Sequence, residues 1–311
     1  MRVLVTGAKG FIGRHLSQRL AQDGHNVVGI GHGAWPDDEA HECGLDSWLN
    51  GEIRGSNLEA LATRMGGAEV IFHLAGGSSV GAAIAAPSED FSRTVTTTTE
   101  LLDWVRLESP ATRVIAISSA AVYGAASLGP LSEVAAPAPC SPYGYHKLMM
   151  EQLCRSFRES FGVNAMVVRA FSVYGSGLKK QLLWDFCSRL SHGTNPVQLG
   201  GSGAELRDWT DVTDLASALS YLLTATAPCP PVLNVGTGVA TSVRHVAELI
   251  LHAWPQPASV TFSGKSRAGD PFSLVADGGR LAELGFKWST PVERGIANYV
   301  DWFREQSGRK S

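Results

Sequence analysis

The segment SPYGYHK places two tyrosines just upstream of a lysine. Ser141 can cap a helix N-terminus and Pro142 suits the first helical position, so a helix is expected to begin here. Within that helix Tyr143 and Lys147 are four residues apart and share a face, whereas Tyr145 points elsewhere. A phenol beside an ammonium can exchange protons with a substrate oxygen, because the positive charge favours the phenolate. Tyr143 is therefore the candidate acid/base, and the alternative for this pair alone is a tyrosine packed on a lysine stem.

A second group of residues could bind phosphate. The stretch VLVTGAKGFIGRHL places Gly7, Gly10 and Gly13 between a predicted strand and a predicted helix. In a dinucleotide site such glycines allow a tight turn, close approach of the backbone to the pyrophosphate, and close packing of helix on strand. The helix N-terminus adds unpaired N–H groups and a partial positive charge. The pattern therefore predicts a cradle for a dinucleotide.

The elements that must position these groups alternate along the first half of the chain. Strands are expected at Val3–Val5, Val27–Ile30, Val70–His73, Val114–Ser118 and Ala165–Arg169, with helices near residues 11–23, 57–66, 88–109 and 142–161. This alternation predicts an α/β fold with a Rossmann-like, doubly wound parallel sheet. We expect residues 1–171 to form the NAD(P)-binding domain, which also receives roughly residues 208–240. Residues 172–311 are expected to form a smaller, interleaved substrate-binding region.

Composition excludes several classes of function. The chain has 311 residues, of which 18% are charged and 44% hydrophobic, as in ordinary soluble globular proteins. A net charge of −3 gives no reason to expect nucleic acid or an anionic membrane surface as a partner. No apolar run reaches the roughly 18 residues of a membrane span, and MRVLVTG enters a strand without a signal peptide. The five cysteines are scattered without a C-x-x-C pair, which favours free thiols in the cytoplasm and no metal site.

Eight short blocks in order along the chain resemble one known family. They are TGAKGFIG, GEIRG, HLAGGSS, SSAAVYG, SPYGYHK, RAFSVYG, RDWTDVTD and NVGTG. Through them the chain resembles the extended short-chain dehydrogenase/reductase superfamily, in its nucleotide-sugar epimerase/dehydratase/reductase branch (UDP-galactose 4-epimerase-like). The resemblance implies that Tyr143 is the acid/base and Lys147 its partner at the nicotinamide ribose. It also implies that Ser119, rather than Ser118, bonds the reacting oxygen, and it leaves Tyr145 as a packing residue.

The resemblance implies a set of cofactor-binding positions. They are Gly7, Gly10, Phe11, Ile12, Gly13, His32, Glu52, Ile53, Ala75, Gly76, Gly77 and Lys147. NAD-preferring relatives usually carry an acidic residue at the end of the second strand, where this chain has Gly31 followed by His32. Without that carboxylate a 2′-phosphate is tolerated and His32 could contact it, so NADP is expected, with NAD left open. The alternative for His32 is a solvent-facing side chain at a permissive turn.

On the substrate side the resemblance implies five binding residues: Ser78, Ser119, Ser172, Arg207 and Arg267. The two arginines occupy positions that resemble the family's diphosphate ligands, and a guanidinium matches phosphate oxygens in shape and charge. Three positions depart from the family pattern. Glu52 replaces an aspartate, and Thr94 and Ser172 each replace an asparagine.

Two alanines limit the reaction. Ala120 and Ala121 occupy positions where 4,6-dehydratases of this branch carry acidic residues, and alanine cannot transfer a proton. Hydride transfer at a ring carbon, expected at C4, remains. A dissociable NADPH favours a 4-keto-sugar reductase, and the alternative is a 4-epimerase that retains NAD.

Three further expectations follow from the same residues. A non-catalytic dinucleotide-binding relative would be expected to lose Tyr143, Lys147 or Ser119, and all three are present, so an enzyme is favoured. Its expected partner is a nucleotide sugar, although a small alcohol or ketone would need no arginine contact. By resemblance, a homodimer through the helices at 88–109 and 142–161 is expected.

Overall fold

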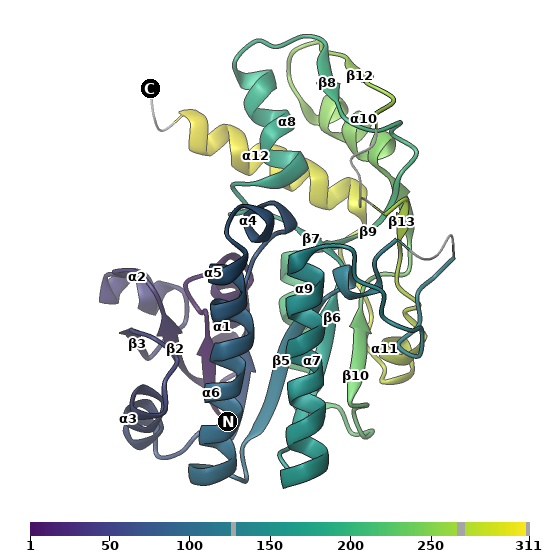
Figure 1. Ribbon diagram of the computed structural model, residues 1–311. Helices are drawn as coiled ribbons and strands as arrows, with labels where there is room; N and C mark the ends of the chain where they lie inside the picture. The colour runs from purple at the N-terminus through teal and green to yellow at the C-terminus, as the bar shows by residue number, and fades with distance from the viewer. Residues whose placement is uncertain (126–128, 266–270, 309–311) are drawn as a thin grey trace.

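A seven-stranded parallel sheet forms the centre of the larger part of the molecule (Figure 1). The computed structural model describes residues 1–125, 129–265 and 271–308. The strands follow the order β10-β6-β5-β4-β1-β2-β3. Their bounds are β1 Arg2–Thr6, β2 Asn26–Gly31, β3 Ser47–Asn50, β4 Val70–His73, β5 Arg113–Ser119, β6 Ala165–Ala170 and β10 Val232–Val235. The order reverses between β1 and β4, the switch point at which open α/β sheets bind ligands, and the predicted α/β fold is confirmed.

Helices cover both faces of this sheet. Helix α1 (Phe11–Gln22) packs with α9 (Val212–Thr224) on one face, and α3 (Gly55–Met65), α6 (Thr97–Glu108) and α7 (Pro142–Phe161) cover the other. Side chains alternate across a strand, so Val3 and Val5 lie in the core under α1 and α9, and Leu4 in the core under α3, α6 and α7. Burial on both faces explains the unbroken apolar run of β1.

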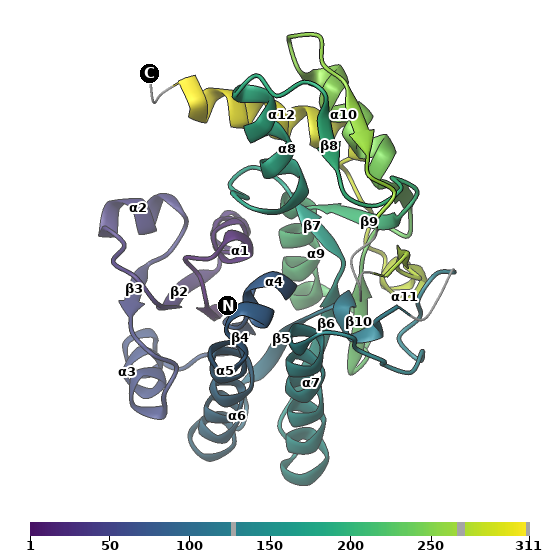
Figure 2. The ribbon, with the colours of Figure 1, turned by 45° about the horizontal axis from the view of Figure 1, so that its top comes forward.

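The smaller region lies over the carboxyl ends of these strands (Figure 2). A four-stranded sheet combines β7 (Ser172–Tyr174), β9 (Leu206–Asp211), β11 (Ala240–Ser242) and β13 (Ser273–Leu274), while β8 (Val197–Leu199) pairs with β12 (Val260–Phe262). Helices α8 (Gln181–Ser191), α10 (Val243–Ala253) and α12 (Val292–Gly308) share a core around Phe186, Ile250 and Tyr299. Because α9 and β10 return to the large sheet, the two regions are interleaved.

Some elements differ from the sequence expectation. Strand β3 and the short helices α2 (Asp37–Glu42), α4 (Val80–Ala85) and α11 (Gly279–Glu283) were not expected. The helix expected at 88–109 consists of α5 (Pro87–Phe91), a π-helical turn (Ser92–Thr96) and α6. Hydroxyls of Thr97, Thr98 and Thr99 donate to carbonyls four residues earlier, which keeps this β-branched run helical. The side chain of Tyr145 is 52% exposed, so its prediction as a packing residue is wrong within the single chain.

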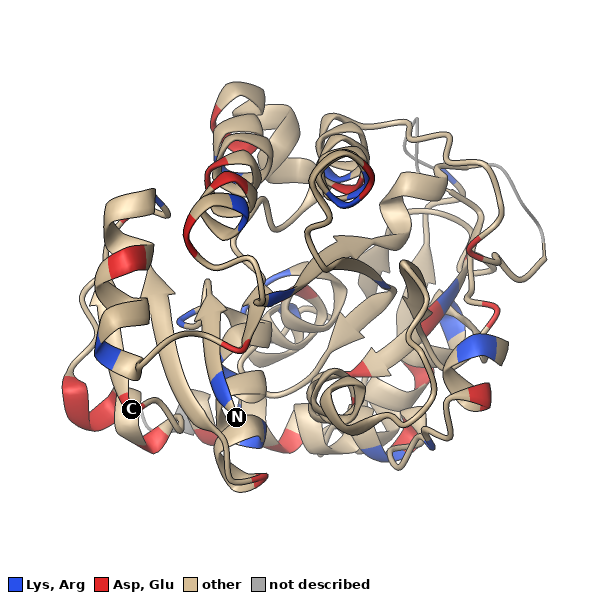
Figure 3. Ribbon diagram, turned by 90° about the horizontal axis from the view of Figure 1, so that it is seen from below, with Lys and Arg blue, Asp and Glu red and all other residues tan. Residues whose placement is uncertain are grey.

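Several structural features bear on partners. Acidic and basic residues are interspersed along the ribbon rather than gathered by sign (Figure 3). None of the helices in the described ranges is both long and apolar enough to cross a bilayer. All five cysteines are free thiols. Within the described part of the chain, His, Cys, Asp and Glu form no cluster that could hold a metal ion.

Candidate active site

A cleft of about 1830 Å³ lies at the carboxyl ends of the central strands, and both regions of the molecule line it. It brings together seventeen of the predicted site residues: Gly7, Gly10, Phe11, Ile12, Gly13, His32, Glu52, Ile53, Ala75, Gly76, Gly77, Ser78, Ser119, Tyr143, Lys147, Ser172 and Arg207. Arg267 lies outside the described residues. Because these residues come from segments far apart in the sequence, their meeting in one cleft depends on the tertiary fold.

The glycine-rich turn after β1 is shaped for close approach. Gly7 has a φ of +70°, and a Cβ there would be 3.0 Å from the backbone nitrogen of Ala75. A Cβ on Gly13 would be 2.3 Å from the carbonyl oxygen of Gly7, so α1 can pack this tightly only with glycine. The N-terminus of α1 has neither a side-chain cap nor an acidic residue in its first turn. Its N–H groups can therefore serve a pyrophosphate, and the turn fits a nicotinamide dinucleotide.

Tyr143 and Lys147 lie in the first turns of α7. Ser141 begins this helix, because its hydroxyl accepts a hydrogen bond of 3.2 Å from the nitrogen of Gly144. Ser119, at the end of β5, lies beside the phenol of Tyr143, and hydrogen bonding from its side chain lowers the pKa of that phenol. Its neighbour Ser118 instead donates to the buried Glu151 at 2.5 Å. Of the two serines, Ser119, which the motif predicts to bond the reacting oxygen, is thus the one beside Tyr143.

Burial dominates the titration of this pair. It raises the pKa of Tyr143 to about 12, an effect that the bond to Ser119 reduces and the charge of Asp90 increases. Burial lowers the pKa of Lys147 to about 8, against the opposing charges of Asp90 and Glu151. The Lys147 ammonium donates to the carbonyl of Ile117 at 2.9 Å. In the chain by itself, desolvation therefore holds the pKa of this phenol above its ordinary value.

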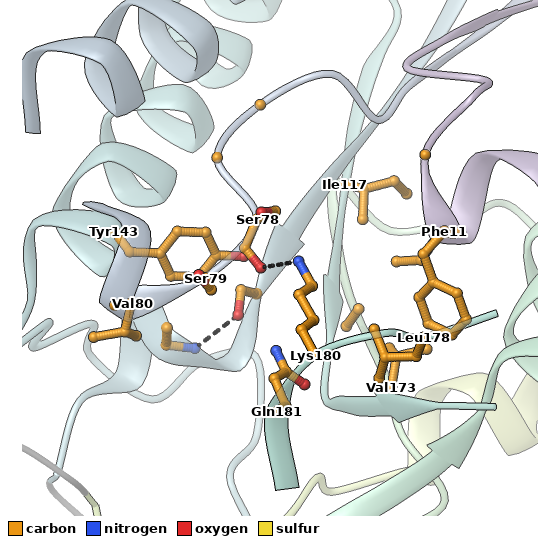
Figure 4. A pocket seen from close by; sticks show the side chains of 18 of the residues that line it. Phe11, Ser78, Ser79, Val80, Ile117, Tyr143, Val173, Leu178, Lys180 and Gln181 are labelled. Atoms are coloured by element: carbon orange, nitrogen blue, oxygen red, sulfur yellow. Dashed lines mark hydrogen bonds between the residues drawn. The ribbon is translucent and has the colours of Figure 1, made fainter. Parts of the chain in front are cut away.

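The opposite wall of the cleft carries further cations, among them Arg207 and Lys180. Arg207, on β9, donates to the carbonyls of Leu206 and Phe272 at 2.7 and 3.3 Å. Lys180, in the loop between β7 and α8, donates to the carbonyl of Ser78 at 3.1 Å (Figure 4). Sequence reasoning missed Lys180 because it lies in a stretch without periodic pattern. Its only sequence signal is that two consecutive lysines, Lys179 and Lys180, follow shortly after the end of β7.

Known proteins with similar sequences identify the family of this chain. Residues 3–236 match the NAD dependent epimerase/dehydratase family. The chain belongs to this family. The UDP-glucose 4-epimerase of Mycolicibacterium smegmatis is 31% identical over 318 residues, which cover 99% of this chain and 100% of that protein.

Two solved structures of similar proteins extend the comparison. MoeE5, in complex with UDP-glucuronic acid and NAD, has a TM-score of 0.85 at 32% identity, covering 98% of this chain and 100% of that one. The UDP-glucuronic acid 4-epimerase from Bacillus cereus, in complex with UDP-glucuronic acid and NAD, has a TM-score of 0.87 at 25% identity, with coverage of 98% and 100%. The predicted superfamily is confirmed, and this family member is an enzyme of the NAD-dependent nucleotide-sugar epimerase/dehydratase type.

One hydrogen-bonded pair beside Tyr143 and Lys147 was not predicted. The buried carboxylate of Asp90 lies 2.6 Å from Nδ1 of His146. It also lies against Gly77, where a Cβ would be 1.8 Å from Oδ1, so this approach requires glycine. Its charge raises the pKa of both Tyr143 and Lys147. No local pattern could reveal the pair, because 56 residues separate its members.

The far end of the cleft is where the resemblance places the adenosine. His32 is exposed there, next to Gly31, where a Cβ would be 3.0 Å from the Trp48 ring. Glu52 forms an ion pair of 2.6 Å with Arg54, and both side chains are mostly exposed. This end therefore presents both a carboxylate and a guanidinium beside the histidine.

Proposed function

We propose that this enzyme is a UDP-sugar 4-epimerase that retains NAD. The observation that carries the proposal is the placement of Tyr143 and Ser119 together in the cleft, with Ala120 and Ala121 lining it beside them. Elimination of water needs a further proton-transferring group near the leaving hydroxyl, and two alanines cannot supply it. Epimerisation needs only one proton-exchanging group at the oxygen on C4, together with a returned hydride.

The expected cofactor and reaction direction are revised in this proposal. Gly31 and His32 favoured NADP, and therefore a reductase. The two structures described above hold NAD, and the named relatives include 4-epimerases, which supports NAD and epimerisation. Retention follows from the chemistry, because an epimerase must return to the sugar the hydride that it removed.

The proposed roles of the chain's own residues divide along the cleft. The turn at Gly7–Gly13 holds the pyrophosphate, and Lys147 holds the nicotinamide ribose. NAD bound there would supply the chemistry of hydride removal from C4 and its return. Tyr143 takes the proton of the C4 hydroxyl and returns it, while Ser119 holds the same oxygen. Arg207 and Ser172 hold the substrate so that its sugar can rotate between removal of the hydride and its return.

The test is to identify the bound nicotinamide and the product. The purified protein is denatured, the released nucleotide is identified by mass, and the native enzyme is incubated with UDP-glucose and UDP-glucuronic acid without added cofactor. We expect NAD in the protein and a C4 epimer of at least one sugar by NMR. A cofactor-free protein that oxidises NADPH with a 4-keto sugar would overturn the proposal and establish the reductase.

We also propose that the enzyme is a homodimer. The resemblance predicts contact through the helices at 88–109 and 142–161, and these segments expose several large apolar side chains: Phe91, Leu107, Tyr145, Met149 and Phe161. Covering such a surface with a second copy would bury it. Light scattering after size exclusion tests this, and a mass of one chain at micromolar concentration would contradict it.

A further inference from the structure

We propose that the sugar accepted by this enzyme carries a carboxylate, and that Lys180 binds it. The inference rests on the proposed epimerase function and names its class of substrate, a UDP-linked uronic acid. Lys180 reaches across the cleft from the loop between β7 and α8 and donates to the Ser78 carbonyl at 3.1 Å. In Figure 4 its ammonium lies between Tyr143 on one side and Ile117 and Phe11 on the other.

The position of the ammonium points to the sugar rather than to the diphosphate. Ser78 follows Gly77, which lies against Asp90, and the charge of Asp90 acts on the phenol of Tyr143. Lys180 therefore meets the loop that borders the reacting end of the cleft. Arg207, the proposed diphosphate ligand, is held elsewhere by carbonyls of β9 and of residue 272.

The charge of Lys180 is not balanced within the described chain. Some other basic side chains on the cleft wall have acidic partners, as Arg189 has Asp185 at 2.9 Å and Arg93 has Glu89. For Lys180 no described carboxylate forms an ion pair, and its bond is to a backbone carbonyl. An ammonium has three donors, so donors remain for a ligand after Ser78 is served.

Burial supports the same conclusion. Lys180 is half-buried, and burial lowers the pKa of its ammonium without an opposing acidic neighbour in the described residues. A cation held away from water without a counter-ion is costly. A ligand carboxylate would remove this cost, whereas a neutral hydroxymethyl group would leave it in place.

The backbone holds this lysine in place by a strained turn. Gln181, the residue after Lys180, has a φ of +68°, and it is the one non-glycine residue with a positive φ in the described ranges. Both side chains line the cleft. Such strain costs on the order of 1–3 kcal/mol and is found mainly at ligand clamps and active sites. The turn therefore points to a clamp for the ligand rather than to a simple connection.

The experiment measures the affinity of the NAD-loaded enzyme for UDP-glucuronic acid, UDP-glucose and UDP by titration calorimetry. Lys180→Met is compared with the wild type and with Lys179→Met, a matched control at the exposed neighbouring lysine. We expect the wild type to bind UDP-glucuronic acid at least tenfold more tightly than UDP-glucose. Because Lys180→Met removes a charge-assisted hydrogen bond, its affinity for UDP-glucuronic acid should be about 10- to 100-fold lower than that of the wild type. The affinity of Lys180→Met for UDP-glucose and UDP should stay within about twofold of the wild-type value. The affinity of Lys179→Met should stay within that range for all three ligands.

Three results would overturn the inference. An equal loss of affinity for all three ligands in Lys180→Met would show that the lysine binds the diphosphate. Equal wild-type affinity for the two sugars, with UDP-glucose converted to its C4 epimer, would refute the inference while the epimerase function stands. If neither sugar binds and no epimer forms, the proposed function fails and the inference fails with it. Retained UDP-glucose binding in Lys180→Met shows that the variant is folded.

Discussion

The two walls of the cleft bind by different means. On the sheet side the cradle consists of backbone, with the turn at Gly7 and the uncapped N-terminus of α1, and the proposed catalytic side chains stand on regular elements. On the opposite side the candidate ligands are long side chains, Arg207 on a short strand and Lys180 in a strained loop. The comparison suggests that cofactor and chemistry depend on the sheet, whereas the identity of the sugar depends on side chains that can change without disturbing it.

The sheet side also has a rigid foundation. Arg169 on β6 forms an ion pair of 2.6 Å with Glu151 on α7, and both are buried. Arg169 also donates to the hydroxyl of Tyr123 at 2.8 Å, and Tyr123 donates to Asn234 at 2.7 Å. This network ties β6, α7 and β10 together beneath Ser118. The network fixes α7, the helix that carries Tyr143 and Lys147, against the sheet.

The largest effect is expected from Tyr143→Phe, which tests whether chemistry belongs to the sheet side alone. Removing the proton-exchanging hydroxyl should lower the rate of C4 inversion by about 10²–10⁴-fold. The amount of bound NAD and the affinity for substrate should remain nearly unchanged, because the phenyl ring keeps its packing. Product formation followed by NMR, with NAD measured by mass, checks this. Turnover close to that of the wild type would remove Tyr143 from its proposed role.

The next effect concerns the stability of the sheet side in acid. His73 is buried between the hydroxyls of Thr6 and Thr98, at 2.9 and 3.0 Å, and burial lowers its pKa to about 3, with a smaller contribution from Lys147. The unfolded chain takes up this proton near pH 6.5, so stability that is present above that pH is lost as the pH falls towards 3. At pH 4.5 the loss should be on the order of 3 kcal/mol.

The measurement is denaturant unfolding of the wild type and His73→Gln at pH 7 and pH 4.5. The glutamine does not titrate. The loss in free energy of unfolding between pH 7 and pH 4.5 should therefore be smaller in His73→Gln than in the wild type, by about the loss given above for His73. An identical pH dependence in both proteins would mean that other groups control acid stability. The buried His73 would then not distinguish the sheet side of the cleft from the opposite side.

The substrate side should respond differently when Arg207 is changed. Arg207→Met removes a proposed diphosphate contact and should raise KM for the UDP-sugar by about 10- to 100-fold, as for a charge-assisted hydrogen bond. Because the residue does not act on C4, kcat should change little and bound NAD should be unaffected. Arg155→Met, on the exposed surface of α7, is the control and should leave both constants unchanged. If Arg207→Met lost NAD as well, the two walls would not be separable.

The smallest effect separates backbone strain from cofactor contact. Gly7 and Gly24 both have positive φ, +70° and +81°, so Gly→Ala at either should lower the free energy of unfolding by about 1–2 kcal/mol. A Cβ at Gly7 would meet the Ala75 backbone, whereas nothing lies within 4 Å of one at Gly24. NAD affinity should therefore fall by about tenfold only in Gly7→Ala, since about 1.4 kcal/mol of lost contact is tenfold. Equal NAD affinity in the two variants would mean that the turn does not hold the phosphates.

The sequence by itself determined the features that depend on short-range geometry. The four-residue spacing of Tyr143 and Lys147 places both on one helical face, and the glycines after β1 mark the turn between strand and helix. The alternation of apolar runs and helical patterns is enough to predict five of the seven strands of the large sheet, β1, β2, β4, β5 and β6. These features are readable because the period of a helix or strand is a local property of the chain.

Only the tertiary structure decided which distant residues meet and how they titrate. Asp90 pairs with His146 across 56 residues, and Lys180 reaches Ser78 across 102. The pKa of Tyr143 rises because folding removes the phenol from water, although its sequence neighbourhood suggested the reverse. Long-range contact and desolvation depend on how complete elements pack against one another, so no local pattern of residues contains them.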